Sequence, residues 1–254
     1  MNRLKGYHRP NNVEDALQLL NRSEVKTAVL AGGTSLIANL PDEVDEVVDL
    51  QVVGLNRVSH EADQMTIASM VTLQTLVEDQ EAPNLLRRMA HREGPNTFRN
   101  AATIGGVIAG ADPESELLAA LLVMETAVSI QTQTETKTVT LSDFLKNVGS
   151  ALQGGVITAV SLRKLTQTAH ARVARTPQDK PIVAAVAAKT EQGELRLALC
   201  GVAETAVLIK PASLDTLMPH GDFRGSSSYR KQMAAVLTNR VLNELTINPS
   251  ESSE

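Results

Sequence analysis

Two glycine pairs, each beside a threonine, constrain this chain more than any other feature of its sequence. The first lies in LAGGTS at residues 30–35, and the second lies in TIGG at residues 103–106. Glycine accepts positive φ angles and lets another group approach the backbone closely. Successive exposed N–H groups in such a turn form a concave set of donors that suits an anion. Two such turns in one chain predict a site for the two phosphates of a dinucleotide.

Each glycine pair could instead be an ordinary turn, because glycine is a common turn residue. For a single pair we would favour that interpretation, whereas two pairs in these contexts favour anion binding. Neither segment matches the G-x-G-x-x-G of a Rossmann fold or the lysine-containing P-loop. The sequence therefore disfavours both of those nucleotide-binding folds.

The composition argues against several other classes of protein. The chain of 254 residues has a net charge of −5, 2% aromatic residues and no Trp, unlike a module that stacks nucleic-acid bases. Cys200 is the only cysteine, so neither an intrachain disulfide nor a cysteine-ligated iron–sulfur cluster can form. The five histidines are scattered, without metal-ligand spacing. No apolar run reaches the ~20 residues of a membrane span, and no signal-peptide core is present, so we expect a cytoplasmic protein.

Residues 1–57 are expected to form a small β-α-β-α-β unit. Asn12 is a candidate cap for a helix over residues 13–23, and residues 27–33 read as a strand that ends in the first glycine pair. A second helix is expected over residues 35–40, capped by Thr34 and Ser35. Residues 45–51 read as a further strand.

Residues 58–163 are expected to form a middle region in which strands pair mainly as hairpins. Helices are expected over residues 84–93 and 115–127 from their apolar periodicity. Residues 64–76 read as a strand, a turn and the start of a helix. A hairpin pair is expected at residues 127–133 and 136–145, and another strand at residues 156–162.

Residues 164–247 are expected to form a third region. Residues 171–190 and 193–209 read as two long strands joined by a hairpin near Gln192-Gly193. A helix is expected over residues 226–245, with more apolar positions than one face needs, so part of it could form an interface. Residues 248–254 are expected to be a disordered polar tail.

At these residues the chain resembles the FAD-binding medium subunits of the molybdenum hydroxylases, such as xanthine dehydrogenase and carbon monoxide dehydrogenase. The resemblance covers nearly the whole chain and is carried by LAGGTSL, RNAATIGGVIAGADPESELLAALL, RTPQD and SSYRKQMAAVL. It implies an α+β fold of the PCMH type, which is like vanillyl-alcohol oxidase. Two α/β FAD-binding subdomains would be followed by a C-terminal domain of antiparallel sheet and helix.

The resemblance implies that the backbone around both glycine pairs holds the FAD pyrophosphate. The residues carried over are Leu30, Ala31, Gly32, Gly33, Thr34, Ser35, Leu36, Thr103, Ile104, Gly105 and Gly106. Neutral donors and helix N-termini suffice for a diphosphate, so no lysine is required.

Three charged residues are further candidates for cofactor binding. Glu116 matches an acid that lies near the adenosine ribose in the family, but it could equally be a favourable acid in a first helical turn. Asp179 and Lys180 fall in the segment that closes over the isoalloxazine in the family. Alternatively, Asp179 and Lys180 could simply be surface charges at the start of a strand. The chain departs from the family at Val107, usually Asn, and at Ala68, usually Gly.

The resemblance implies a flavoprotein subunit that transfers electrons and supplies no catalytic acid or base. Its expected partners are a molybdopterin-binding large subunit and a 2Fe–2S small subunit, with NAD, quinone or oxygen as the electron acceptor. One alternative is a degenerate member without flavin that serves a structural or regulatory role, as Val107, Ala68 and the few aromatics suggest. Another is a standalone FAD oxidase, which the lack of a convergent set of His, Tyr or Cys residues disfavours.

Overall fold

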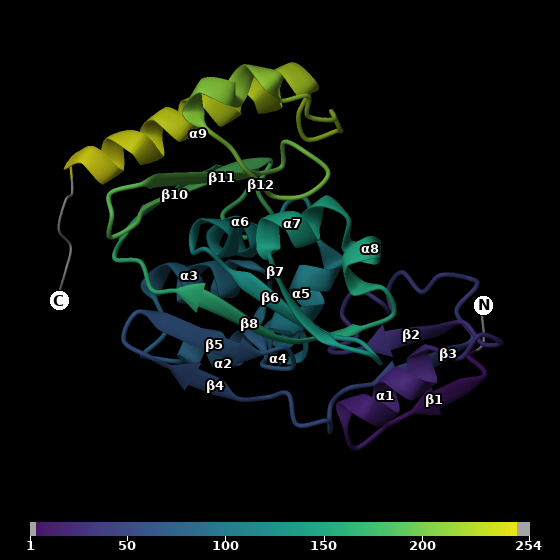
Figure 1. The fold of residues 1–254 in the computed structure, drawn as a ribbon. Coiled ribbons are helices and arrows are strands. Elements are labelled where there is room, and N and C mark those ends of the chain that lie inside the picture. Colours follow the sequence, from purple (N-terminus) through teal and green to yellow (C-terminus); the bar gives the residue numbers. More distant parts are fainter. Residues whose placement is uncertain (1–3, 248–254) are drawn as a thin grey trace.

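The computed structural model describes residues 4–247, so the predicted polar tail lies outside the described part of the chain. These residues form three sheets, which follow one another along the sequence (Figure 1). The strands of the first sheet are β1 (Gly6–His8), β2 (Thr27–Leu30) and β3 (Glu46–Asp49). They are parallel, in the order β1-β3-β2.

Helix α1 (Val13–Leu20) follows β1, and its start agrees with the prediction. The Asn12 side chain accepts a hydrogen bond from the Asp15 N–H at 2.7 Å, which satisfies one of the free donors at a helix N-terminus. The predicted helix over residues 35–40 is wrong, because the chain forms only turns there. Ile37 is 58% exposed, and a short segment that buries no apolar face does not hold a helix.

The middle sheet contains β4 (Val58–His60), β5 (Gln64–Ala68), β6 (Ala127–Gln131), β7 (Thr136–Thr140) and β8 (Val156–Arg163). Its order is β4-β5-β8-β6-β7, and every neighbouring pair is antiparallel. The predicted hairpin is present, but its second strand ends at Thr140. There the Thr140 hydroxyl accepts a hydrogen bond from the Asp143 N–H at 3.1 Å and begins α7 (Leu141–Lys146).

Helices of the middle region connect and cover this sheet. They are α2 (Leu73–Glu78), α3 (Asn84–Arg92), α4 (Asn96–Ala101), α5 (Ile104–Gly110), α6 (Glu116–Val123) and α8 (Val148–Leu152). Every residue of α6 is buried, as expected for a helix that is apolar on all sides. It packs between α3 and the third sheet.

The third sheet is antiparallel, in the order β12-β11-β10-β9. Its strands are β9 (Gln167–Val173), β10 (Val183–Lys189), β11 (Leu195–Cys200) and β12 (Val207–Leu208). The long strand predicted over residues 171–190 is two strands, because the chain reverses in a loop that contains Pro177 and Pro181. Proline lacks the N–H that a sheet ladder needs. The hairpin at Gln192-Gly193 is confirmed, with Gly193 at φ +80°.

A short 3₁₀ helix η1 (Pro211–Thr216) precedes the long helix α9 (Ser227–Ile247). Helix α9 covers the outer face of the third sheet, while α6 packs on the inner face (Figure 1). Ala234, Leu237 and Val241 of α9 are buried against the sheet, whereas Val236 is 42% exposed. Between residues 4 and 247, no helix has both the length and the apolar character that crossing a bilayer requires.

Candidate functional site

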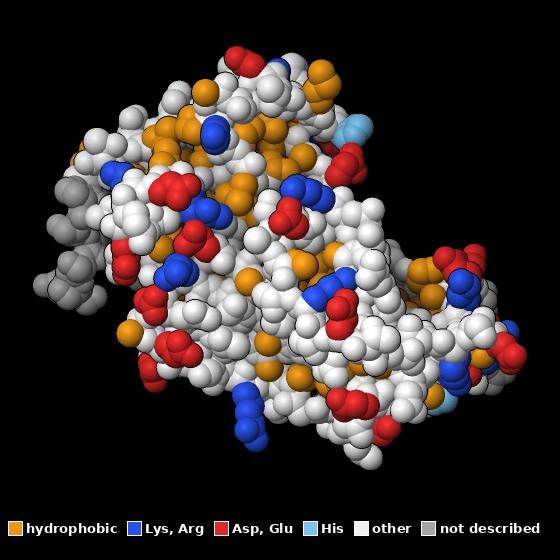
Figure 2. All heavy atoms as spheres, in the orientation of Figure 1, with side chains coloured by type: hydrophobic (Ala, Val, Ile, Leu, Met, Phe, Trp, Pro, Cys, Tyr) orange, Lys and Arg blue, Asp and Glu red, His pale blue; other side chains and the backbone are white. Residues whose placement is uncertain are grey.

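Both glycine pairs line one cavity of about 310 Å³. We call residues 30–36 the first glycine segment and residues 103–106 the second. In the view of Figure 2 the surface is hollowed between the N-terminal unit and the main body of the molecule. The remaining walls are mostly aliphatic, with no Phe or Tyr, and include Val29, Leu50, Met70, Leu152, Val156 and Ile157. The cavity lies within the size range of small-molecule sites, which is roughly 300–1,000 Å³.

The first glycine segment leaves the end of β2 and packs closely against the chain that precedes the second segment. A Cβ atom added to Gly32 would lie 1.8 Å from the Ala101 carbonyl oxygen. Gly33 has φ +72°, a left-handed conformation that L side chains rarely adopt. The backbone geometry therefore requires both glycines: Gly32 for the close approach to Ala101, and Gly33 for its positive φ.

The second glycine segment begins α5 and uses its own N–H groups to hold itself in place. The Thr103 hydroxyl accepts a hydrogen bond from the Gly106 N–H at 3.1 Å. The Gly105 N–H donates to the Ser69 carbonyl at 2.9 Å, and the Ile104 N–H donates to the Val71 carbonyl at 3.0 Å. A Cβ on Gly105 would lie 2.7 Å from the Ser69 Cβ. Glycine at this position thus lets α5 pack directly against the end of β5.

The first glycine segment, in contrast, presents free donors. Within residues 4–247, no hydrogen-bond acceptor faces the backbone N–H groups of Gly33, Thr34, Ser35 or Leu36. All four residues line the cavity. Consecutive unpaired N–H groups beside a concave wall form an anion site without any charged side chain.

Ser69 is a lining residue that sequence reasoning missed. Its side chain is buried, with the residue 3% exposed, yet its hydroxyl has no hydrogen-bond partner among the described residues. A buried hydroxyl without a partner is costly, so this atom indicates a bound polar group. The only sequence signal was its position directly after the strand at residues 64–68.

The structure brings together most of the predicted binding residues. Ala31, Gly32, Gly33, Thr34, Ser35, Leu36, Thr103, Gly105 and Gly106 all line the cavity. Leu30 and Ile104 do not line it. Leu30 ends β2, and Ile104 is fully buried in the core behind the second glycine segment.

Glu116 is not among the residues that line the cavity. Its buried carboxylate is 2.6 Å from the His170 Nε2 and 3.1 Å from the Arg172 Nε. These contacts join the first turn of α6 to β9. A carboxylate in the first turn also interacts favourably with the helix dipole.

Asp179 and Lys180 also lie outside the glycine cavity. The Lys180 ammonium group pairs with Asp112 and lies 3.8 Å from the Glu93 carboxylate. Burial would lower the pKa of Lys180, but the carboxylates of Glu93 and Asp112 outweigh it and raise that pKa. Burial raises the pKa of Glu93, whose carboxylate accepts hydrogen bonds at the start of α6. The Asp179 carboxylate accepts a hydrogen bond from the Thr176 N–H at 3.1 Å.

The donor set of the glycine cavity fits a dinucleotide diphosphate. Its unpaired N–H groups suit phosphate oxygens, its glycines allow close approach, and its aliphatic walls suit an apolar ring. A metal ion has no comparable site, because among residues 4–247 no three His, Cys, Asp or Glu side chains are grouped as ligands.

The class of protein follows from a family comparison. Residues 2–163 match the family described as the FAD binding domain in molybdopterin dehydrogenase. The chain therefore belongs to this family, and its cofactor is FAD. The resemblance inferred from the glycine segments is thereby confirmed.

Individual relatives extend the match to nearly the whole chain. The glyceraldehyde dehydrogenase medium chain of Sulfolobus acidocaldarius is 26% identical over 94% of this chain and 97% of the relative. The carbon monoxide dehydrogenase medium chain of Afipia carboxidovorans is 27% identical over 93% of this chain and 94% of the relative. This chain is thus related to subunits of molybdenum-containing oxidoreductases.

A solved structure confirms the α+β fold. Carbon monoxide dehydrogenase from Hydrogenophaga pseudoflava, determined in a form that lacks the Mo-pyranopterin moiety, superposes with a TM-score of 0.85. The match covers 96% of this chain and 97% of that one, at 22% identity.

Proposed function

We propose that this chain is the electron-transfer subunit of a molybdopterin-dependent dehydrogenase, and that the glycine cavity binds the pyrophosphate of its FAD. One observation carries the proposal. Residues 33–36, whose N–H groups are unpaired, and Ser69, whose buried hydroxyl has no partner among the described residues, line the same cavity. Because the chain belongs to an FAD-binding family, we assign FAD as the ligand of these donors.

In this proposal the two glycine segments have different tasks toward FAD. The N–H groups of residues 33–36 donate to phosphate oxygens, while Gly105 and Gly106 keep the opposite wall flat enough for close approach. Leu30 and Ile104 support the two segments from behind. Glu116, Asp179 and Lys180 remain proposed contacts for the outer parts of the cofactor. FAD, when bound, supplies the electron-transfer chemistry, and the chain binds and orients it.

The two departures from the family pattern do not touch the glycine cavity. Val107 and Ala68 are half-buried and pack against the main hydrophobic core. Neither lines the cavity. This packing supports retention of FAD, against the alternative of a degenerate subunit.

The proposed partners are a molybdopterin-binding large subunit and a 2Fe–2S small subunit, with NAD, quinone or oxygen as the acceptor. The relatives are named as medium chains of dehydrogenases, which supports an assembly of this kind. We further propose a cytoplasmic location. Residues 1–57, 58–163 and 164–247 are proposed as three domains, because each range contains one complete sheet.

The visible absorption spectrum of the purified full-length chain tests the cofactor proposal. The spectrum is recorded before and after FAD is added and the protein is separated by gel filtration. Flavin bands that co-elute at near-equal stoichiometry are expected. A colourless protein that still excludes FAD would overturn the proposal and favour the degenerate-subunit alternative.

A further inference from the structure

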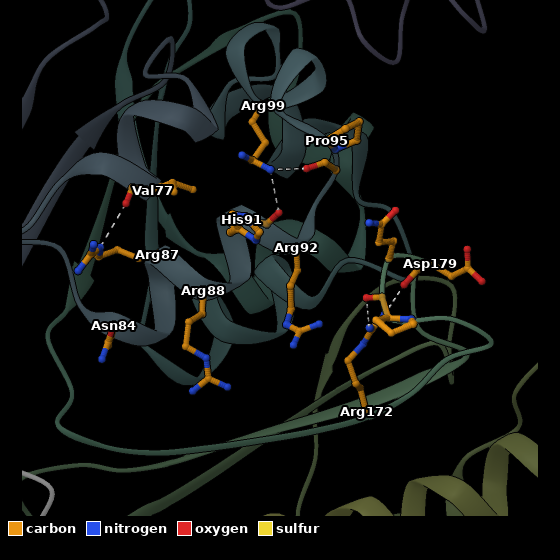
Figure 3. Close-up of a pocket in the computed structure, with 13 residues that line it drawn as sticks. Val77, Asn84, Arg87, Arg88, His91, Arg92, Pro95, Arg99, Arg172 and Asp179 are labelled. Atoms are coloured by element: carbon orange, nitrogen blue, oxygen red, sulfur yellow. Dashed lines mark hydrogen bonds between the residues drawn. The ribbon is translucent and has the colours of Figure 1, made fainter.

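A second cavity, distinct from the glycine cavity, is lined by an unusual number of arginines. Its volume is about 750 Å³, and it shares no lining residue with the glycine cavity. Five guanidinium groups line it, from Arg87, Arg88 and Arg92 on α3, Arg99 on α4 and Arg172 on β9 (Figure 3). We call it the arginine pocket.

The positive charges of this pocket are poorly compensated. Its only acidic lining residue is Asp179, in a chain whose net charge is −5. Among the described residues, the side chains of Arg88 and Arg92 have neither a hydrogen bond nor an ion pair. These two lie four residues apart on α3, a spacing at which like charges repel on a helix.

Arg99 differs from Arg88 and Arg92, because neutral groups of the protein hold its guanidinium. The residue is only 8% exposed, and its guanidinium donates to neutral acceptors, namely the Gln74 amide oxygen and the carbonyls of His91 and Gly94. No carboxylate within residues 4–247 pairs with it. The His91 carbonyl lies in the last turn of α3 and the Gly94 carbonyl just beyond it, where the helix dipole favours a positive charge. Arg99 is therefore held by structural contacts at the end of α3.

Arg172 differs from the others because Glu116 compensates its charge, at 3.1 Å. Arg172 also donates to the Pro177 and Asp179 carbonyls, which fixes the loop that forms one side of the pocket. The arginines left without any partner are therefore Arg88 and Arg92, while the Arg87 Nε–H donates to the Val77 carbonyl at 3.3 Å.

We propose that the arginine pocket binds a small molecule that carries at least two phosphate groups, as a nucleoside diphosphate does. Planar guanidinium groups bind phosphate oxygens in pairs, and two arginines without partners, in a pocket whose only acidic lining residue is Asp179, match a diphosphate better than a single carboxylate. The volume of the pocket lies within the range of small-molecule sites, roughly 300–1,000 Å³. A concave pocket of this size favours a small ligand over a folded partner.

Isothermal titration of the full-length, FAD-loaded chain with ADP and with inorganic pyrophosphate tests this proposal. Saturation with FAD keeps both probes out of the glycine cavity. One molecule of either probe is expected to bind per chain, with an affinity that falls as salt is added. A double variant, Arg88→Gln with Arg92→Gln, should bind at least about tenfold more weakly, because it loses two charge-assisted contacts.

Arg240→Gln is the matched control, since Arg240 is an exposed arginine on α9, remote in sequence from the pocket. It should leave probe affinity unchanged. Titration of the Gly33→Val variant without FAD, in which the glycine cavity is impaired, should still show binding.

Three results would overturn the proposal. The first is equal affinity of the double variant and the unmodified chain. The second is binding that disappears when FAD is present, which would assign the probes to the glycine cavity. The third is the absence of binding by both probes.

Discussion

The two glycine segments share a motif, line the same cavity and yet use their backbone in opposite ways. The second segment gives its N–H groups to the Ser69 and Val71 carbonyls and to the Thr103 hydroxyl. The first leaves the N–H groups of residues 33–36 unpaired. One segment therefore builds the wall of the site, and the other offers the donors. We therefore expect substitutions in the second segment to lower the free energy of unfolding. Similar substitutions in the first segment should mainly weaken FAD binding.

Gly105→Val should have the largest effect, because it acts on the segment that builds the wall. The new side chain would enter the space of the Ser69 Cβ and carbonyl, at 2.7 and 2.9 Å. Overpacking against backbone should lower the free energy of unfolding by about 3 kcal/mol, with loss of FAD. Thermal unfolding and flavin content measure both effects.

Gly149→Ala is the control for Gly105→Val, because its added Cβ meets nothing closer than 3.8 Å. It should keep its FAD and should not lower stability, because alanine favours a helix more than glycine does. If Gly105→Val keeps its stability while it loses FAD, the assignment of the second segment as a structural wall is wrong.

Gly33→Val acts on the donor segment and should affect FAD more than the fold. Its Cβ would contact only the ends of the Leu30 and Ile37 side chains, at 3.3 Å. The left-handed backbone at φ +72° should cost valine about 1–2 kcal/mol. Reorientation of the N–H groups should weaken FAD binding at least about tenfold, which corresponds to ~1.4 kcal/mol.

Gly193→Val is the matched control for Gly33→Val. It lies in a remote hairpin at φ +80°, with open space around the added Cβ. It should suffer the same backbone strain and keep its FAD. Equal loss of FAD in both variants would show that strain alone, and not the donor set, explains the effect.

The sequence predicted that the two glycine segments form one site, but it could not predict this division of tasks. Glycine content and the neighbouring threonine are visible in the sequence. Which N–H groups remain free depends on the carbonyls of Ser69 and Val71, more than thirty residues before Gly105. Such long-range pairing leaves no local pattern.

The errors in the predicted elements have a related cause. The composition of residues 35–40 is typical of a helix, but Ile37 is 58% exposed, so no buried apolar face stabilises a helix there. The strand predicted over residues 171–190 reverses at two prolines, and the resulting loop presents Pro177 to the arginine pocket. In the sequence, the arginines of α3 have the pattern of the solvated side of an amphipathic helix, and nothing local shows that Arg99 and Arg172 line the same pocket.

Two threonines provide a smaller test of the same comparison. Thr103 caps α5 through its hydroxyl, so Thr103→Ala should lower the free energy of unfolding by about 1 kcal/mol. The Thr34 hydroxyl has no partner within residues 4–247, so Thr34→Ala should leave stability unchanged and weaken FAD binding a few-fold. Chemical denaturation without FAD, followed by FAD titration, separates the two. Equal losses of stability in Thr103→Ala and Thr34→Ala would contradict the assignment of a structural role to the second segment and a binding role to the first.

Ser69 lines the cavity beside both segments: its carbonyl anchors Gly105, and its buried hydroxyl has no partner among the described residues. Ser69→Ala keeps the carbonyl and removes only the hydroxyl. FAD binding should weaken by about 0.5–1.5 kcal/mol, the net value of one hydrogen bond. The free energy of unfolding without FAD should stay constant or rise, because a buried unpaired hydroxyl is lost.

Ser115→Ala is the matched control for Ser69→Ala, since Ser115 is also buried but its hydroxyl bonds to Glu93 and to the Leu118 N–H. That variant should lose stability and keep its FAD affinity. Denaturation should therefore show a loss of stability only in Ser115→Ala. FAD titration should show a loss of affinity only in Ser69→Ala. If Ser69→Ala behaves like Ser115→Ala, the Ser69 hydroxyl is a structural group, and the donor set for FAD is confined to the first glycine segment.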